Sequence, residues 1–134
     1  MKTAKVEYLG SLRTKAKHLR SGAEFITDAP LDNHGKGEAF SPTDLASTSL
    51  ASCMLTVMGI AAQTHAIKID GAYADVLKMM KENPRRIGQI EIDIHMPKHD
   101  YTSKEKSILE HPAKTCPVAE SLHPDLEIIL RFHW

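Results

Sequence analysis

The feature that most constrains the fold is a run of eighteen residues, 45–62, without a single charged side chain. Wound as a helix, this run places alanine, leucine, methionine or valine on every side, which is typical of a buried helix. Ser41, Pro42 and Asp44 precede it in the residue order of a capping box with proline at the first helical position. We therefore expect one long, buried central helix from about residue 41 to about residue 65.

A helix of this length spans roughly 37 Å at 1.5 Å per residue. A chain of 134 residues is too small to cover it on all sides by itself. The sequence therefore predicts that a partner helps to bury the central helix.

The same run reaches the lower length limit for a membrane-spanning helix. Five of its eighteen residues are serine or threonine, and Asp44 lies in the first helical turn. The sequences on both sides also have the pattern of a globular protein. We interpret the run as the core helix of a soluble protein and expect no membrane partner.

Composition narrows the possible functions further. The length predicts one domain, residues 1–134. Lysine plus arginine balances aspartate plus glutamate at 17 each, so no basic surface for nucleic acid is expected. No signal segment precedes the first alternating strand, and two cysteines are too few for a secreted disulfide scaffold, which favours a cytoplasmic location.

The periodicity along the chain predicts an α+β fold with a mostly antiparallel sheet. Residues 72–81 fit either a strand or a helix, and as a strand they would pair with the following strand around Asn83-Pro84. The other expected elements, in order, are strands at 4–8, 12–19 and 23–27, a loop at 28–40, the central helix, a strand at 90–96, a short helix capped by Ser103 and ending near Glu110, a second one starting at Cys116, and a strand at 126–132.

The two cysteines, Cys53 in the central helix and Cys116, allow three hypotheses. Cys53 is an inert core residue, since free cysteine is often buried. Alternatively, the pair binds a metal with some of the eight histidines, although neither a C-x-x-C motif nor close histidine spacing supports this. Or the pair forms a nucleophile and a resolving thiol that cycle through sulfenate and disulfide. We expect no metal and no cofactor.

Local electrostatics taken alone favour Cys116 as the ionised thiol. It precedes Pro117 at a helix start, where the helix dipole and free amides stabilise a thiolate. Cys53 lies in the middle of a helix and needs a cation from another segment. Arg13, Arg20 and the Arg85-Arg86 pair all remain candidates at this point.

Ser-Pro-Thr-Asp-Leu followed after eight residues by Cys53, together with the later Cys116-Pro117-Val118, resembles the OsmC/Ohr family of peroxide-reducing proteins. The resemblance covers most of the chain. It implies an intertwined homodimer with the long central helices buried in a shared core, which agrees with the need for a covering partner.

The resemblance also implies a mechanism and its residues. Cys53 would attack a peroxide, Cys116 would resolve the sulfenate, and Arg13 would assist as the early-strand arginine. A thiol reductant would then restore both cysteines. Peroxidase members carry a glutamate directly after the proline, where this chain has Thr43; Glu38 is our candidate substitute.

Two functions from different classes follow. The first is a cytosolic antioxidant enzyme, a thiol peroxidase acting on organic hydroperoxides or hydrogen peroxide in the oxidative stress response. The second is a non-catalytic OsmC-like dimer that binds a small molecule at the subunit boundary. Metal storage or sensing is a third and weaker hypothesis. Only the peroxidase requires Cys53 to react.

Overall fold

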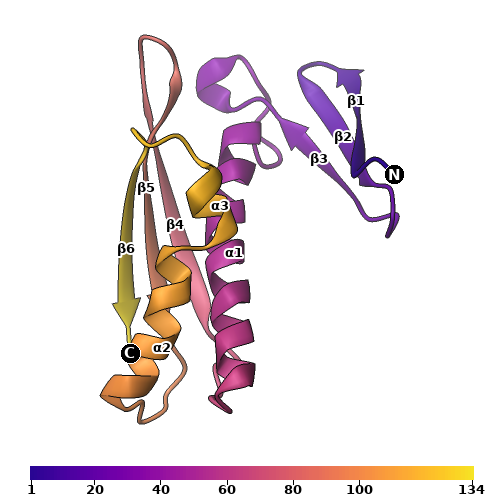
Figure 1. The fold of residues 1–134 in the computed structure, drawn as a ribbon. Coiled ribbons are helices and arrows are strands. Elements are labelled where there is room, and N and C mark those ends of the chain that lie inside the picture. The colour runs from indigo at the N-terminus through magenta and orange to yellow at the C-terminus, as the bar shows by residue number, and fades with distance from the viewer. The chain divides into compact units, whose positions relative to one another are not determined.

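The computed structural model describes residues 1–134, and the chain divides into two units, residues 1–46 and residues 47–134. Each unit contains one three-stranded sheet, and the helices belong mainly to the second unit (Figure 1). The predicted α+β class is confirmed.

The first unit is an antiparallel meander of three consecutive strands: β1 (Ala4–Gly10), β2 (Arg13–His18) and β3 (Glu24–Asp28). The alternation of the sequence divides the side chains between two faces, because successive residues of a strand point to opposite sides. One face carries Val6, Tyr8 and Phe25, all exposed in this chain. The strands predicted at 4–8, 12–19 and 23–27 are therefore present, with slightly different bounds.

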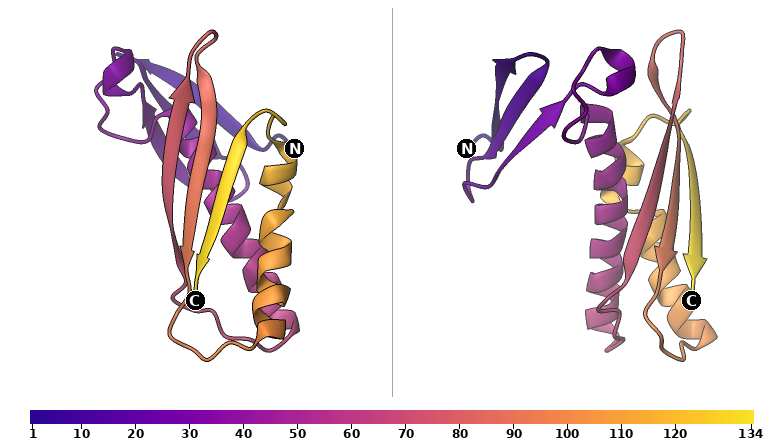
Figure 2. Two further views of the ribbon diagram at one scale, coloured as in Figure 1. Left: turned by 90° about the vertical axis from the view of Figure 1, so that its left-hand side faces the viewer. Right: turned by 180° about the vertical axis from the view of Figure 1, so that it is seen from behind.

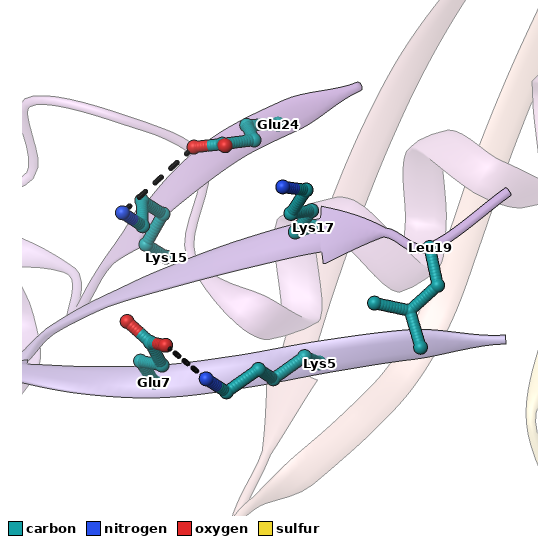
Figure 3. Close-up of a pocket in the computed structure, with 6 residues that line it drawn as sticks. All are labelled: Lys5, Glu7, Lys15, Lys17, Leu19 and Glu24. Atoms are coloured by element: carbon teal, nitrogen blue, oxygen red, sulfur yellow. Dashed lines mark ion pairs between the residues drawn. The ribbon is translucent and has the colours of Figure 1, made fainter. Parts of the chain in front are cut away.

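The opposite face of this sheet is charged and slightly hollowed (Figure 3). Lys5 pairs with Glu7 at 2.7 Å along β1, and Lys15 pairs with Glu24 at 3.8 Å between β2 and β3. Lys17 and Leu19 complete the lining.

The segment from β3 to the long helix is a tight loop containing the single-turn helix η1 (Leu31–Asn33). Gly35 sits so close to the backbone of Ala29 that an added Cβ would overlap its carbonyl oxygen at 1.7 Å. Only glycine fits there, because it has no side chain. The loop therefore has a defined path that leads to Ser41 and the helix start.

The long helix α1 (Pro42–Thr64) begins at a capping box, as predicted. The Asp44 amide donates to Ser41 Oγ at 3.0 Å, and the Ser41 amide donates to Asp44 Oδ2 at 3.0 Å. These reciprocal bonds satisfy amides that have no partner within the helix.

The second unit contains the rest of α1 and a mixed sheet in the order β4-β5-β6. Strands β4 and β5 form an antiparallel hairpin, so the strand interpretation of residues 72–81 is correct. Strand β6 runs parallel to β5, which requires a crossover connection, and two helices supply it. The elements are β4 (Tyr73–Lys81), β5 (Arg86–His95), α2 (Ser103–Lys114), α3 (Pro117–Ser121) and β6 (Glu127–His133).

Helices α1 and α2 lie on the same face of this sheet (Figures 1 and 2). The sheet contributes Ile90, Ile92 and Ile94, each fully buried. Leu50 of α1 and Leu109 of α2 are fully buried in the same core. The alternation of isoleucine with charged residues in β5 thus places one side of the strand in the core.

Only one side of α1 is buried in the single chain. Its buried residues within the second unit are Ser47, Leu50, Ala51, Met54, Met58 and Ala62. Ser52, Thr56 and Ile60 are exposed on another side. We expected a helix buried on all sides, but a single copy of the chain buries only one stripe of α1.

Helix α2 differs from its prediction at both ends. Thr102, not Ser103, is the N-cap, in a capping box with Glu105. The helix also continues past Glu110 through Pro112 to Lys114. Burial explains the extension, since Ala113 in the last turn is fully buried and packing overrides the local preference against proline.

Candidate active site

The two cysteines lie together in the second unit. Helix α1 carries Cys53, which is partly buried in the single chain and packs against the core of the second unit. Cys116 precedes α3 as its N-cap and is only 1% exposed. Cys53 lies near enough to Cys116 to be one of the causes that raise the pKa of the Cys116 thiol. The structure therefore brings together two cysteines that are 63 positions apart in the sequence.

The predicted position of Cys116 at a helix start is confirmed, but its expected ionisation is not. Its sulfur accepts a hydrogen bond from the Ala119 amide at 3.5 Å, which favours the thiolate. Burial acts in the opposite direction and is the larger effect, so the pKa of Cys116 is raised above its usual range. A thiol with a raised pKa keeps its proton more readily, which suits a resolving thiol rather than the attacking one.

The two other predicted site residues, Arg13 and Glu38, lie together in the first unit. Arg13 Nη2 donates to Glu38 Oε2 at 3.0 Å. Arg13 is also held by Asp28, with Nε to Oδ1 at 2.7 Å and Nη2 to Oδ2 at 2.9 Å. These hydrogen bonds, led by those that Arg13 donates to Asp28, raise the pKa of Arg13 above its already high usual value. The guanidinium is therefore fixed in place and permanently charged.

Asp28 is a member of this group that sequence reasoning missed. It is 1% exposed, and besides Arg13 it accepts a hydrogen bond from the Glu38 amide at 3.1 Å. The Arg13 hydrogen bond is the main reason why the pKa of Asp28 is lowered. The signal was present in the strand register, because Asp28 lies directly opposite Arg13 across β2 and β3.

The remaining arginine candidates fall elsewhere. Arg85 pairs with Glu82 at 3.6 Å, and Arg86 donates to the carbonyl of Pro84 at 2.6 Å, so both serve the turn between β4 and β5. Arg20 is exposed just after β2. Of the guanidinium groups considered, only Arg13 is held in a site of buried and charged partners.

The start of α1 carries no substitute for the missing family glutamate. Asp44 accepts from the Ser41 amide, so it acts as a cap, as predicted. Thr43 lies with its hydroxyl 3.2 Å from that of Ser41. The carboxylates that contact Arg13 are instead those of Asp28 and Glu38.

The histidines on strands have ordinary partners. His18 contacts Ser21, His95 contacts Asp75 at 3.1 Å, and His133 contacts Asp93 at 2.8 Å. No group of three or more histidine, cysteine, aspartate or glutamate side chains is arranged to hold a metal ion. The hollow of Figure 3 includes neither a cysteine nor Arg13.

The fold and the neighbouring cysteines define a class, that of small α+β proteins with a cysteine pair at a long core helix. The family described as OsmC-like protein matches residues 35–131, so the chain belongs to the OsmC family. None of the curated protein sequences matches the chain significantly.

Solved structures give the same fold. A protein of Psychrobacter arcticus 273-4, proposed to act in osmotic stress and detoxification, is 52% identical, with a TM-score of 0.95 over 99% of this chain and 96% of its own. An organic hydroperoxide resistance protein OsmC of Legionella pneumophila is 12% identical, with a TM-score of 0.77 over 100% and 98%. An organic hydroperoxide resistance protein of Elizabethkingia anophelis is 15% identical, with a TM-score of 0.75 over 99% and 96%.

Helix α1 is long and apolar enough to cross a membrane by length and composition. The core helix of a soluble protein passes the same test, and α1 packs Leu50, Met54 and Met58 into the core of the second unit. The OsmC fold is a soluble one, and α1 is its central helix.

Proposed function

We propose that the protein is a thiol-dependent peroxidase that reduces organic hydroperoxides or hydrogen peroxide through Cys53, with Cys116 as the resolving thiol. The observation that carries this proposal is that Cys53 of the long helix lies near the buried Cys116, whose pKa is raised by burial and, to a smaller extent, by Cys53. Membership of a family in which some proteins are named for organic hydroperoxide resistance supports it.

The proposed reaction has two steps on the protein. The Cys53 thiolate attacks the distal peroxide oxygen, the O–O bond breaks, and the alkoxide or hydroxide leaves and takes a proton to become alcohol or water. The resulting sulfenic acid is then attacked by the Cys116 sulfur, which forms the disulfide and releases water. Two equivalents of an external thiol then reduce the disulfide.

Arg13 and Glu38 are the proposed assisting pair. A guanidinium fixed by two carboxylates presents its remaining N–H groups in a defined direction, which suits the binding of a peroxide oxygen. Asp28 is the buried partner that holds Arg13 in this orientation. Thr43 in place of the family glutamate leaves Glu38 as the carboxylate of the proposed site.

We also propose that the working unit is a homodimer and that it is cytoplasmic. The side of α1 that is exposed in the single chain includes Ser52, Thr56 and Ile60; we call it the open side. The helix has no charged residue between residues 45 and 62, and a second copy of α1 would cover this side. Both cysteines are free thiols, which suits a reducing compartment.

The test is to follow peroxide and thiol consumption with purified protein, together with mass spectrometry of the oxidised product. Without added thiol the proposal expects one peroxide lost per protein and a Cys53–Cys116 disulfide. With an external thiol it expects continued turnover, which Cys53→Ser should lack. Cys116→Ser should stop at the sulfenate after a single turnover. If the six methionines oxidise while neither sulfenate nor disulfide forms, the proposed peroxidase function is wrong, and a non-catalytic binding role for the dimer is favoured.

A further inference from the structure

One residue of the first unit, Ala29, hydrogen-bonds through both of its backbone groups to segments that are distant in the sequence. Its amide donates to the carbonyl oxygen of Leu12 at 3.0 Å, and its carbonyl oxygen accepts from the Gly37 amide at 3.2 Å. Leu12 belongs to the turn between β1 and β2, and Gly37 belongs to the loop between β3 and α1. The turn and the loop are therefore joined through a single residue that directly follows β3.

The three residues joined in this way are neighbours of the charged group of the proposed site. Each is next in sequence to one of its members, in the pairs Leu12 and Arg13, Asp28 and Ala29, and Gly37 and Glu38. A hydrogen bond between two backbone segments fixes the points from which the adjacent side chains extend. The backbone bonds of Ala29 therefore restrain the distance over which Glu38 reaches Arg13.

Both ends of this arrangement have a left-handed backbone, with φ at +62° in Leu12 and in Gly37. Leucine rarely adopts this conformation, and it persists only where the surroundings hold it. Here the Leu12 amide donates to the Tyr8 hydroxyl at 3.2 Å, while Ala29 holds the carbonyl. At Gly37 an added Cβ would also lie 2.9 Å from Leu31 Cγ. The two ends are thus held in conformations that an unrestrained chain would avoid.

We propose that these three residues form a backbone clamp that positions Glu38 against Arg13. The Glu38 side chain is 66% exposed and lies in a loop, so a single ion pair to Arg13 would hold it only weakly. The clamp adds the restraint that this ion pair lacks. Its members are positioning residues, because they act through Glu38 and Arg13. The inference rests on the proposed function for its effect on activity, whereas the clamp can be measured without a substrate.

Valine at residue 37 tests the clamp. A β-branched residue rarely has a positive φ, so Gly37→Val should displace the backbone and break the bond to Ala29. Gly22→Val is the matched control, since Gly22 is also exposed and left-handed, with φ at +79°, and an added Cβ there meets no heavy atom within 4 Å. Gly37→Asn keeps a residue that tolerates this conformation and should behave like the wild type. It also serves as the test variant if Gly37→Val does not fold, in which case faster exchange of the Ala29 amide than in the wild type is expected to accompany any loss of activity.

Amide hydrogen exchange followed by NMR measures the clamp directly. In the wild type the amides of Ala29, Gly37 and Glu38 should be protected, because each donates a hydrogen bond within the first unit. In Gly37→Val the amides of Ala29 and Glu38 should exchange several-fold faster, and in Gly22→Val their rates should not change. Unprotected Ala29 or Gly37 amides in the wild type overturn the clamp. Unchanged exchange at Ala29 and Glu38 in Gly37→Val also overturns it.

Peroxidase kinetics measure the positioning role. Gly37→Val should lower kcat/KM by about as much as Glu38→Gln does, while Gly22→Val should lose similar stability and keep the wild-type kcat/KM. The double variant with Gly37→Val and Glu38→Gln should be no less active than Glu38→Gln alone, because residues that act as a unit are not additive. Additive losses would mean that Gly37 acts by another route and would overturn the positioning role. A wild type without peroxidase activity refutes the proposed function, and hydrogen exchange then decides whether the clamp exists.

Discussion

Arg13 donates two hydrogen bonds to the carboxylate of Asp28, from Nε to Oδ1 at 2.7 Å and from Nη2 to Oδ2 at 2.9 Å. The two residues face each other across β2 and β3, and Asp28 is 1% exposed while Arg13 retains more of its surface. A bidentate pair with its carboxylate buried fixes the guanidinium in both position and orientation. Within the first unit, this pair is the rigid part of the proposed site, and Glu38 is its exposed part.

We expect Asp28→Asn to lower the melting temperature at pH 7 and to make the melting temperature fall less as the pH is lowered. Because the pKa of Asp28 is lower in the folded protein than its usual 3.8, the ionised carboxylate stabilises the fold at pH values above 3.8. This contribution is lost as the pH falls through the pKa of the folded state. Thermal unfolding from pH 6 to pH 2 should therefore show a smaller decline for the variant than for the wild type. Asp70→Asn, at an exposed residue, is the control. Parallel declines for the wild type and Asp28→Asn would show that the pair does not contribute.

Removal of the Cys116 thiol should change stability at alkaline pH. Because burial raises the pKa of Cys116 above its usual 9.0, the unfolded chain releases this proton before the folded one. The wild type should therefore lose stability relative to Cys116→Ala as the pH rises past 9, by at most about 1.4 kcal/mol per pH unit. Urea unfolding between pH 7 and pH 10.5, with reductant present, measures the difference. A constant difference would mean that the folded and unfolded thiols have the same pKa.

The N-terminus of α2 gives a matched pair of substitutions. Thr102 Oγ1 accepts from the Glu105 amide at 3.1 Å, and Glu105 Oε1 accepts from the Thr102 amide at 3.0 Å. Thr102→Ala should lower the free energy of unfolding by about 1 kcal/mol. The adjacent Ser103→Ala should change it by less than about 0.5 kcal/mol, since Ser103 is exposed and lies inside the helix. Urea unfolding of both variants measures these two losses. A larger loss for Ser103→Ala than for Thr102→Ala would place the cap at Ser103.

Several elements could be predicted from sequence because their signals are local. The capping box of Ser41 and Asp44 is a property of four neighbouring residues, and it lies where it was expected. The alternation through Ile90, Ile92 and Ile94 identifies a strand with one buried face. The family resemblance depends on the spacing of Pro42, Cys53 and Cys116-Pro117, and the family match confirms it.

What the sequence could not provide depends on pairing and burial. The apolar positions within residues 72–81 fit the periodicity of a helix as well as that of a strand, and only the pairing with β5 makes this segment a strand. The pKa of Cys116 was expected to follow the helix start, but its direction is set by the core around it. Asp28 ends a strand and begins a polar loop in the sequence, and its role is visible only once β3 pairs with β2.

We expect Glu38→Gln to reduce peroxidase activity without reducing stability. The Glu38 side chain is 66% exposed, and exposed ion pairs contribute little to folding. If Glu38 helps Arg13 to orient the peroxide, kcat/KM should fall by about tenfold while the melting temperature is unchanged. Glu24→Gln removes a comparable exposed pair with Lys15 on the same sheet and should leave kcat/KM unaltered. Full activity in Glu38→Gln would remove this residue from the proposed site.

The open side of α1 gives a test of the homodimer. Ile60 is 59% exposed in the single chain, on a helix that carries no charge between residues 45 and 62. If a second copy covers this side, Ile60→Glu buries an unpaired carboxylate in the interface and should shift the protein toward monomer. Ser107→Glu adds the same charge on the exposed side of α2 and should leave the dimer intact. Sedimentation velocity across a concentration series distinguishes the two variants. A wild type that sediments as a monomer at every concentration would contradict the homodimer, and the exposed side of α1 would then need another partner.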